Sequence, residues 1–131
     1  MTGDEPAKVA SLGARVHLFV KPAERDRFIT VFKDVLGCNT VERDFGLPHP
    51  ILFVGFDDGS GFSVEFSDDA PDEKIPSRAW IEFRAVGVPE LQQKLRDASI
   101  REFQHPGSPH AYFTAPGGQV FRLIDVAYKG P

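Results

Sequence analysis

Cysteine is nearly absent from this chain, since Cys38 is the only one among 131 residues. A single thiol excludes an intrachain disulfide and a thiolate metal cluster, and it favours a reducing, cytoplasmic compartment. Clusters of basic residues are lacking as well, because the formal net charge is −4 and the pI is near 5.5. Without a basic surface to displace counterions, we expect no binding to nucleic acid or to an acidic membrane.

The first fourteen residues lack both a basic start and a long apolar run. We interpret residues 1–14 as a flexible tail rather than as a signal peptide or a membrane span. The chain as a whole is 41% hydrophobic and contains twelve phenylalanines. That apolar content is enough for one compact domain with its own core, which we place at residues 15–131.

Apolar spacing predicts the same order of elements twice. Module one (15–67) has an alternating strand at 15–20 and a helix at 23–36 between Pro22 and Gly37, followed by strands at 38–44, 51–56 and 61–67. An acidic linker punctuated by prolines follows at 68–78. Module two (79–126) then has a strand at 79–85, a helix at 89–98, and strands at 100–104, 110–114 and 119–126. The sequence therefore predicts two βαβββ modules in an α+β domain.

Alternation assigns two faces to four of these strands. The apolar face should lie under the helices and consists of Val16, Leu18, Val20, Phe62, Val64, Phe66, Ile81, Phe83, Ala85, Phe121 and Leu123. The second face carries His17, Phe19, Ser63, Glu65, Ser67, Trp80, Glu82, Arg84, Val120, Arg122 and Ile124. We expect the modules to form one curved mixed sheet with the helices outside and the second face around a hollow. Such a hollow, lined by rings and charges, is typical of a small-molecule site.

Two motifs resemble those of a known family. Phe32 to Cys38 (Phe-Lys-Asp-Val-Leu-Gly-Cys) resembles its first-helix ending, and Tyr112 to Leu123 resembles its Tyr-Phe-x-Asp-Pro-Asp-Gly-Asn-x-x-Glu-Leu hairpin. The chain thereby resembles the vicinal oxygen chelate superfamily, which includes glyoxalase I, bleomycin-resistance proteins, fosfomycin-resistance transferases and extradiol dioxygenases. The resemblance covers nearly all of 15–126. It implies the glyoxalase/bleomycin-resistance fold and a homodimer, as in many relatives.

The resemblance also implies where a divalent metal ion would be held, by ligands from the first and last strands of each module. In module one these positions fall on His17 and Glu65, which are chemically suitable. In module two they fall on Trp80 and Arg122, although an indole has no lone pair to offer and a guanidinium is a cation. The hairpin positions that carry Asp in the family hold Ala115 and Gly117. We therefore expect no metal cofactor, with Arg122 in the cation's place and paired with Glu65 or Glu82.

The alternative is a displaced metal site formed by His17, Glu65 and Glu82, since three ligands and a water make a workable catalytic set. The protein would then be a metal-dependent lyase, isomerase or dioxygenase. For His17 alone, an ordinary hydrogen-bonded histidine inside the hollow fits equally well. A purely regulatory or interaction domain is a third possibility.

We favour metal-independent binding of a small organic molecule. Phe19 and Trp80 should form the aromatic walls of its pocket, with Glu65, Glu82 and Arg122 as the charges. Carboxylates beside aromatic rings suit a cationic or planar ligand, and Arg122 suits an anion if Glu65 does not engage it, so both classes stay open.

The alternating residues His110, Tyr112 and Thr114 should also line the pocket. His110 and Tyr112 are then either an acid–base pair or a solvated edge histidine beside a structural tyrosine.

Overall fold

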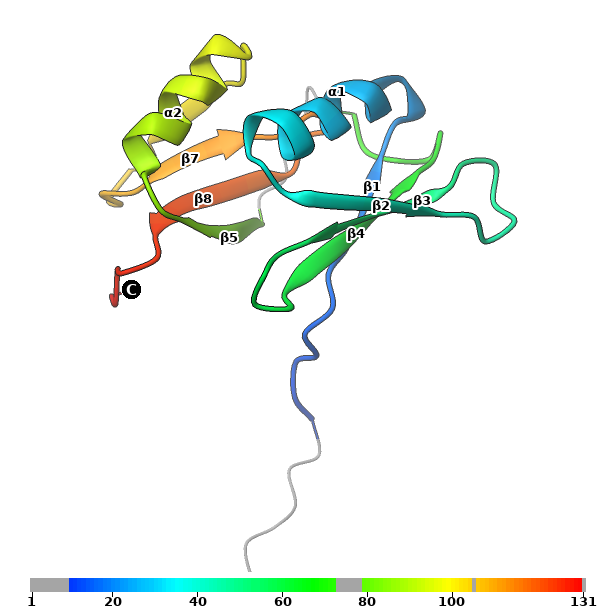
Figure 1. The fold of residues 1–131 in the computed structure, drawn as a ribbon, viewed down its shortest axis with the longest axis horizontal. Helices are drawn as coiled ribbons and strands as arrows, with labels where there is room; N and C mark the ends of the chain where they lie inside the picture. The colour runs from blue at the N-terminus through cyan, green and yellow to red at the C-terminus, as the bar shows by residue number, and fades with distance from the viewer. Residues whose placement is uncertain (1–9, 73–78, 105, 131) are drawn as a thin grey trace, which may run out of the picture.

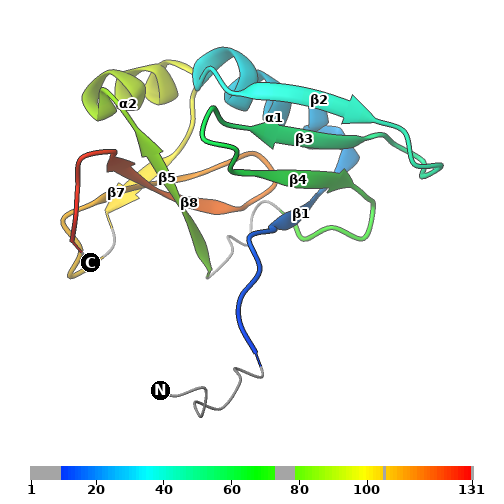
Figure 2. The same cartoon turned by 60° about the horizontal axis from the view of Figure 1, so that its bottom comes forward.

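The structure is a computed structural model that describes residues 10–72, 79–104 and 106–130. In this part of the chain, two helical segments lie side by side on one side of two four-stranded sheets, and no helix covers the opposite side (Figures 1 and 2). Most of the expected tail, residues 1–9, and part of the expected linker, residues 73–78, lie outside the described residues. None of the described helices is long and apolar enough to cross a membrane.

Module one begins with β1 (His17–Val20) and a 3-10 turn, η1 (Pro22–Glu24). The helical segments α1 (Arg25–Ile29) and η2 (Thr30–Val35) follow, and then the strands β2 (Asn39–Arg43), β3 (Ile51–Gly55) and β4 (Gly61–Phe66). Its sheet has the order β1-β4-β3-β2, with β1 parallel to β4 and the other neighbours antiparallel.

Module two repeats this arrangement with β5 (Trp80–Ala85), α2 (Val88–Asp97), β6 (Glu102–Gln104), β7 (Ala111–Thr114) and β8 (Val120–Asp125). Its sheet has the order β5-β8-β7-β6, again with one parallel pair, β5 and β8. The predicted βαβββ repeat and the α+β class are confirmed, with each strand within two residues of its expected ends. In the described part of the chain the strands form two four-stranded sheets, and no strand of one sheet is hydrogen-bonded to a strand of the other.

The first helix differs in detail from the single α-helix expected over 23–36. It starts as a 3-10 turn, continues as α-helix and ends as π-helix. In the last part, the Leu36 N–H donates to the Val31 carbonyl five residues earlier, at 2.9 Å. Apolar spacing does not reveal this change, because Phe28, Val31 and Phe32 face the core in either form of helix.

The apolar faces of the two sheets meet under the helices in one shared core. The Phe32 ring on η2 lies 5.4 Å from Phe62 on β4 and 5.3 Å from Phe121 on β8, so it joins the two modules. The predicted core face is buried or partly buried along β4, β5 and β8. Val16 is the exception, since it precedes β1 and is 37% exposed.

The hairpin between β7 and β8 brings module two against module one. Gly117 and Gly118 have φ values of +95° and +99°, as the sequence predicts for a tight turn. A Cβ atom on Gly117 would lie 2.7 Å from Cγ1 of Val20 at the end of β1. The turn therefore needs glycine both for its backbone angle and for its close contact with β1.

Candidate functional site

The uncovered face of the second sheet carries a row of side chains that crosses all four strands. The register pairs Glu82 on β5 with Arg122 on β8, and Arg122 with Tyr112 on β7. Tyr112 is paired in turn with Phe103 on β6. Trp80 lies on the same face two residues before Glu82, because side chains alternate along a strand. Five positions from four strands are thus brought onto one surface.

Arg122 is at the centre of this surface. Its Nη2 atom donates a hydrogen bond to Oε1 of Glu82 at 2.6 Å, and its guanidinium lies 4.3 Å from the centroid of the Trp80 ring. The Arg122 side chain is only 12% exposed. An ion pair and a cation–π contact therefore fix the guanidinium against the sheet, and the cation–π contact alone is worth ~0.5–2 kcal/mol in such settings.

Glu82 is held by two arginines. Its second oxygen, Oε2, accepts a hydrogen bond from Nη1 of Arg84 at 2.9 Å. The other terminal nitrogen of Arg84, Nη2, donates to the carbonyls of Val126 and Tyr128 at 3.0 and 2.7 Å. Both Glu82 oxygens are thus engaged, and the sequence had placed Arg84 on this face without giving it a role.

The ionisation of the pair follows from these contacts. The hydrogen bond from Arg122, followed by that from Arg84, lowers the pKa of Glu82 below its ordinary value. The same bond to Glu82 is the largest cause that raises the pKa of Arg122. Both groups are therefore charged at neutral pH. The Nε atom of Arg122 is buried and makes no hydrogen bond within the described residues.

Aromatic rings border the arginine. Trp80 meets the edge of Tyr112 with ring centroids 6.0 Å apart, and Tyr112 stacks on Phe103 at 5.5 Å. Trp80 is 43% exposed and Phe103 is 38% exposed, whereas Tyr112 is buried. Sequence reasoning missed Phe103, although its place in the alternation of β6, opposite Tyr112, is the signal that could have found it.

Module one presents a second, smaller polar group on its own sheet. His17 Nδ1 lies 2.7 Å from Ser63 Oγ, and His17 Nε2 lies 3.2 Å from Glu65 Oε1. The edge of the Phe19 ring meets the imidazole at 5.0 Å, and Phe19 is half-exposed. Both ring nitrogens of His17 thus have partners, which agrees with the interpretation of His17 as a hydrogen-bonded histidine.

A pocket of about 270 Å³ adjoins this group. It is lined by His17, Leu18, Phe19, Pro71, Gly117, Gly118 and Gln119. Phe19 and His17 therefore face the β7–β8 hairpin of module two.

The two polar groups occupy equivalent places in the repeat. In module one, His17 on the first strand contacts Glu65 on the last strand, and in module two Trp80 contacts Arg122 in the same way. Of the two partners considered for Arg122, the structure pairs it with Glu82, while Glu65 pairs with His17. The hollow-face residues thus form two clusters, one on each module.

The donor set of this chain does not fit the divalent metal ion that the resemblance implies. Trp80 offers no lone pair, Arg122 is a cation, and both oxygens of Glu82 accept bonds from arginines. In residues 10–72, 79–104 and 106–130, no three His, Cys, Asp or Glu side chains come together as a possible metal site. His17, Glu65 and Glu82 do not form the displaced metal site considered from sequence.

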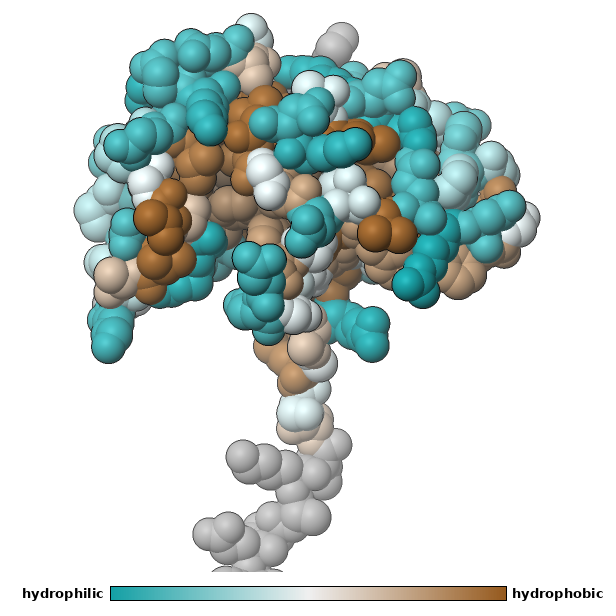
Figure 3. Space-filling view, viewed as in Figure 1, coloured by the Kyte–Doolittle hydropathy of each residue, from teal (hydrophilic) through white to brown (hydrophobic). Residues whose placement is uncertain are grey.

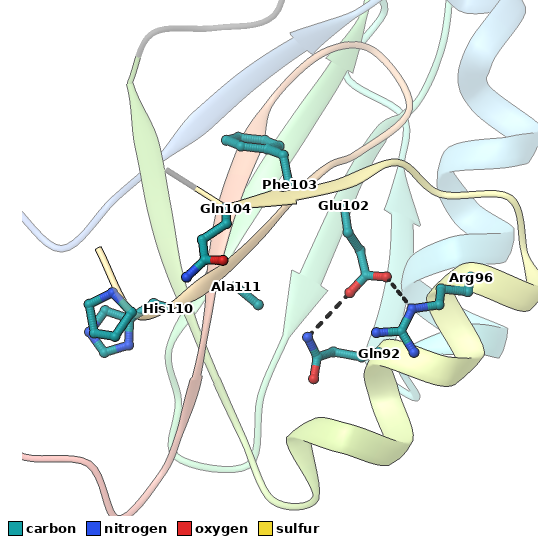
Figure 4. Close-up of a pocket in the computed structure, with 8 residues that line it drawn as sticks. Gln92, Arg96, Glu102, Phe103, Gln104, His110 and Ala111 are labelled. Carbon is teal, nitrogen blue, oxygen red and sulfur yellow. Dashed lines mark hydrogen bonds and ion pairs between the residues drawn. The ribbon is translucent and has the colours of Figure 1, made fainter. Parts of the chain in front are cut away.

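His110 borders a pocket of its own module. It precedes β7 and lines a pocket of about 300 Å³ beside α2, in which Glu102 binds Gln92 and Arg96 (Figure 4). The ring of His110 meets Tyr128 edge-on at 4.7 Å. The Tyr112 hydroxyl lies instead 3.2 Å from Ser108 Oγ. Tyr112 therefore belongs to the surface formed by Trp80, Glu82, Phe103, Tyr112 and Arg122, here called the Arg122 surface, whereas His110 borders a different pocket.

Cys38 is buried at the end of the first helix. Burial raises the pKa of its thiol to about 11. The thiol is therefore protonated at neutral pH and takes no part in the site.

Comparison with solved structures shows which proteins share this architecture. A putative glyoxalase family protein from Bacillus anthracis matches with a TM-score of 0.69 and 11% identity, over 92% of this chain and 98% of that one. The antibiotic-binding protein TnmS3 from Streptomyces sp. CB03234 matches with a TM-score of 0.65 and 14% identity, over 91% and 98% of the two chains. The fosfomycin resistance protein FosX from Listeria monocytogenes matches with a TM-score of 0.67 and 12% identity, over 89% and 92%.

These likenesses establish the fold. The chain has the glyoxalase/bleomycin-resistance fold, as the two sequence motifs imply. No family model and no curated protein matches the sequence itself. The ligand and any reaction therefore have to be argued from the side chains of this chain.

Proposed function

We propose that this protein binds a small organic molecule on the uncovered face of its sheets and does so without a metal ion. The observation that carries the proposal is Arg122, held by Glu82 at 2.6 Å and placed over Trp80 at 4.3 Å. A guanidinium in this place supplies the positive charge that a metal ion supplies in metal-dependent proteins of this fold. The structural likeness to an antibiotic-binding protein is compatible with the same role.

The exposed rings supply the contact surface for a ligand. Trp80 and Phe103 flank the buried Tyr112 and remain partly open to solvent. Stacking on such rings suits a planar molecule and needs no particular functional group on it. Phe19, on the other module, is a further candidate for contact with a ligand that reaches across.

Charge favours an anionic group on that molecule. The two ligand classes left open by the sequence differ in whether Glu82 or Arg122 would receive the ligand. Both Glu82 oxygens are already engaged by arginines. Two arginines and one carboxylate leave this cluster with a net positive charge, which attracts a carboxylate, phosphonate or phenolate.

The fluorescence of Trp80, the only tryptophan, offers a direct test. We expect 2-naphthoate to change this fluorescence saturably in the presence of EDTA, and to bind more tightly than 2-naphthylmethylamine, which has the same rings and the opposite charge. Isothermal titration gives the same affinities independently of the optical signal. Equal affinity for both compounds, or no saturable binding of either, would contradict the proposal.

Two arginine variants separate the site from general effects of charge. Arg122→Gln should weaken 2-naphthoate binding by ~5-fold or more, since it removes a charged contact that is largely shielded from water. Arg43→Gln is the matched control, because Arg43 also lies over an aromatic ring, Phe53, at 5.7 Å, but on module one. It should leave the affinity unchanged. A similar loss in both variants would point to a non-specific effect of net charge.

Metal independence is tested on the same protein. Mn²⁺, Ni²⁺ and Zn²⁺ should give no specific thermal stabilisation of the wild type, whereas the double variant Trp80→His, Arg122→Glu should gain it, because a ligand that binds only the folded state raises its stability. Retention of a stoichiometric ion by the wild type, lost in His17→Ala and Glu65→Gln, would instead support the metal-dependent lyase, isomerase or dioxygenase.

The oligomeric state and compartment complete the proposal. The protein acts as a cytoplasmic homodimer, as inferred from the resemblance and from the single cysteine. The large hydrophobic side chains Val41, Phe45 and Leu47 are all more than 40% exposed, which supports contact with a second copy. Light scattering coupled to size exclusion should give twice the chain mass of 14.5 kDa, and a strictly monomeric protein would disprove the dimer.

A further inference from the structure

A second cavity of ligand size lies between the modules and shares only Glu82 and Arg84 with the cluster around Arg122. Its volume is about 790 Å³, within the range of small-molecule sites. One wall is the turn between β3 and β4, and the other is β5 with the chain that follows β8 (Figure 1). Because β5 is the edge strand of its sheet and residues 81–86 all line the cavity, the cavity follows the free edge of this strand. Trp80, Tyr112 and Arg122 are not among the lining residues.

The interior of this cleft is apolar and partly aromatic. Phe62, Phe83 and Phe121 from β4, β5 and β8 are buried at its base. Phe56 meets Phe83 edge-on at 5.6 Å and is half-buried on one wall. Val86, at the opposite wall, is 79% exposed. Hydrophobic surface bordered by hydrophilic side chains is also visible in the space-filling view of this side of the molecule (Figure 3). An apolar ligand would remove this surface from water.

The rim of the cleft is acidic. Its acidity comes from Asp57 and Asp58, because the other two charged side chains that line it, Glu82 and Arg84, form an ion pair with each other. Arg84 is already bonded to Glu82 and to two carbonyls, so its charge is compensated. Asp58 accepts hydrogen bonds from the N–H and hydroxyl of Ser60 at 3.0 and 2.6 Å, which lowers its pKa. In the described part of the chain neither Asp57 nor Asp58 forms an ion pair with a basic side chain.

We propose that this cleft binds a small molecule with an apolar, aromatic body and a positively charged amine. The body fills the space between Phe56, Phe83 and Val86, and the ammonium group lies at the rim beside Asp57 and Asp58. The charge preference is the opposite of that proposed for the Arg122 surface. The two sites are therefore separable by ligand as well as by mutation, and neither proposal depends on the other.

Three compounds with the same body test the cleft: 4-phenylbutylamine, 4-phenylbutanol and 4-phenylbutyrate. Titration calorimetry should give the order amine, alcohol, carboxylate from tightest to weakest binding. The affinities of the amine and the alcohol should differ by ~2- to 5-fold, because an exposed charge pair contributes about that much. In the double variant Asp57→Asn, Asp58→Asn, the amine should lose its advantage over the alcohol while the alcohol binds as before. Amide nitrogens of Gly61, Ala85 and Val126 should shift in the NMR spectrum of the wild type.

Two further variants locate the binding. Val86→Arg places a long cationic side chain at an exposed position of the wall, so it should abolish amine binding without loss of stability in urea. Trp80→Leu alters only the other surface and should leave amine binding intact.

Three outcomes would overturn the proposal. The first is equal binding of all three compounds, and the second is amine binding lost in Trp80→Leu but kept in Val86→Arg. The third is that the wild type is a dimer and binds no amine, while Val86→Arg makes the protein a monomer. A second copy of the chain would then cover the cleft.

Discussion

Single residues decide how the two modules contact each other, and Gly117 is the sharpest case. We expect Gly117→Ala to lower the free energy of unfolding by ~2–4 kcal/mol, because it combines an unfavourable positive φ with a clash against Val20. Gly59→Ala is the matched control, since Gly59 has a similar φ of +85° with open space around it. It should cost only ~1–2 kcal/mol. Urea unfolding measures both, and equal costs would show that the contact with β1 is unimportant.

Glu82 gives a prediction about pH. Its pKa is lowered in the folded state, so its contribution to stability is present above the ordinary carboxyl value of 4.5 and is lost as pH falls through the lower folded value. Glu82→Gln should therefore cost ~1 kcal/mol at pH 7, a value discounted for partial exposure, and progressively less in acid. Urea unfolding of both proteins between pH 3 and pH 8 measures this difference. A difference that stays constant with pH would contradict the ionic role of the carboxylate.

Residue chemistry also shows how far the sequence could predict the site. An indole and a guanidinium are poor metal ligands whatever surrounds them, so Trp80 and Arg122 already argued against a metal ion. The partner of Arg122 was harder to predict. Glu65 and Glu82 both lie on the uncovered face, and only the register of β5 against β8 selects Glu82. His110 shows the opposite difficulty, because alternation along β7 does not extend to a residue just before the strand.

At the scale of elements, alternation and turn residues predicted almost all of the strands. The β7–β8 hairpin follows from Pro116 and the two glycines, and β5 follows from its regular alternation up to Ala85. The π-helical end of the first helix did not follow, because it keeps the same buried positions as an α-helix. Phe103 was also missed, because its place on this face becomes clear only when the three-residue β6 is paired with β7, opposite Tyr112. A three-residue strand is thus too short to show a periodic pattern, and a π-helical turn cannot be told from an α-helical one by the spacing of its apolar residues.

The pairing of β6 with β7 leads to a prediction for the three rings next to Arg122. Phe103 stacks on Tyr112, which meets Trp80, so the three rings form a continuous line across the sheet. Phe103→Ala should weaken 2-naphthoate binding by ~2- to 10-fold, which corresponds to the free energy of one aromatic contact. The Trp80 emission of the free protein should change little. Val41→Ala is a control for an exposed hydrophobic residue on another edge strand. Unchanged affinity in Phe103→Ala would restrict the site to Trp80 and Arg122.

At the scale of the whole molecule, the two modules share one core, so we expect them to unfold as one unit. Phe121 on β8 contacts Phe32 and Phe62 of module one as well as Phe83 and Phe113 of its own module, with ring centroids 5.3 to 6.4 Å apart. The repeat alone would allow two independent halves, and the sequence showed only that each half leaves a sheet face uncovered. Contacts of this kind depend on packing between modules, which periodicity along the chain does not encode.

Cooperative unfolding tests this shared core. Phe121→Ala should cost ~3–5 kcal/mol, because it empties a buried ring position at the centre of both modules. Trp80 fluorescence reports on module two, and NMR signals of β3 and β4 report on module one. In the wild type and in Phe121→Ala both probes should give the same urea midpoint, since neither sheet keeps a complete core alone. Separate midpoints, with module one unaffected by the substitution, would show that each module is stable on its own. The contacts between the modules would then not stabilise either of them.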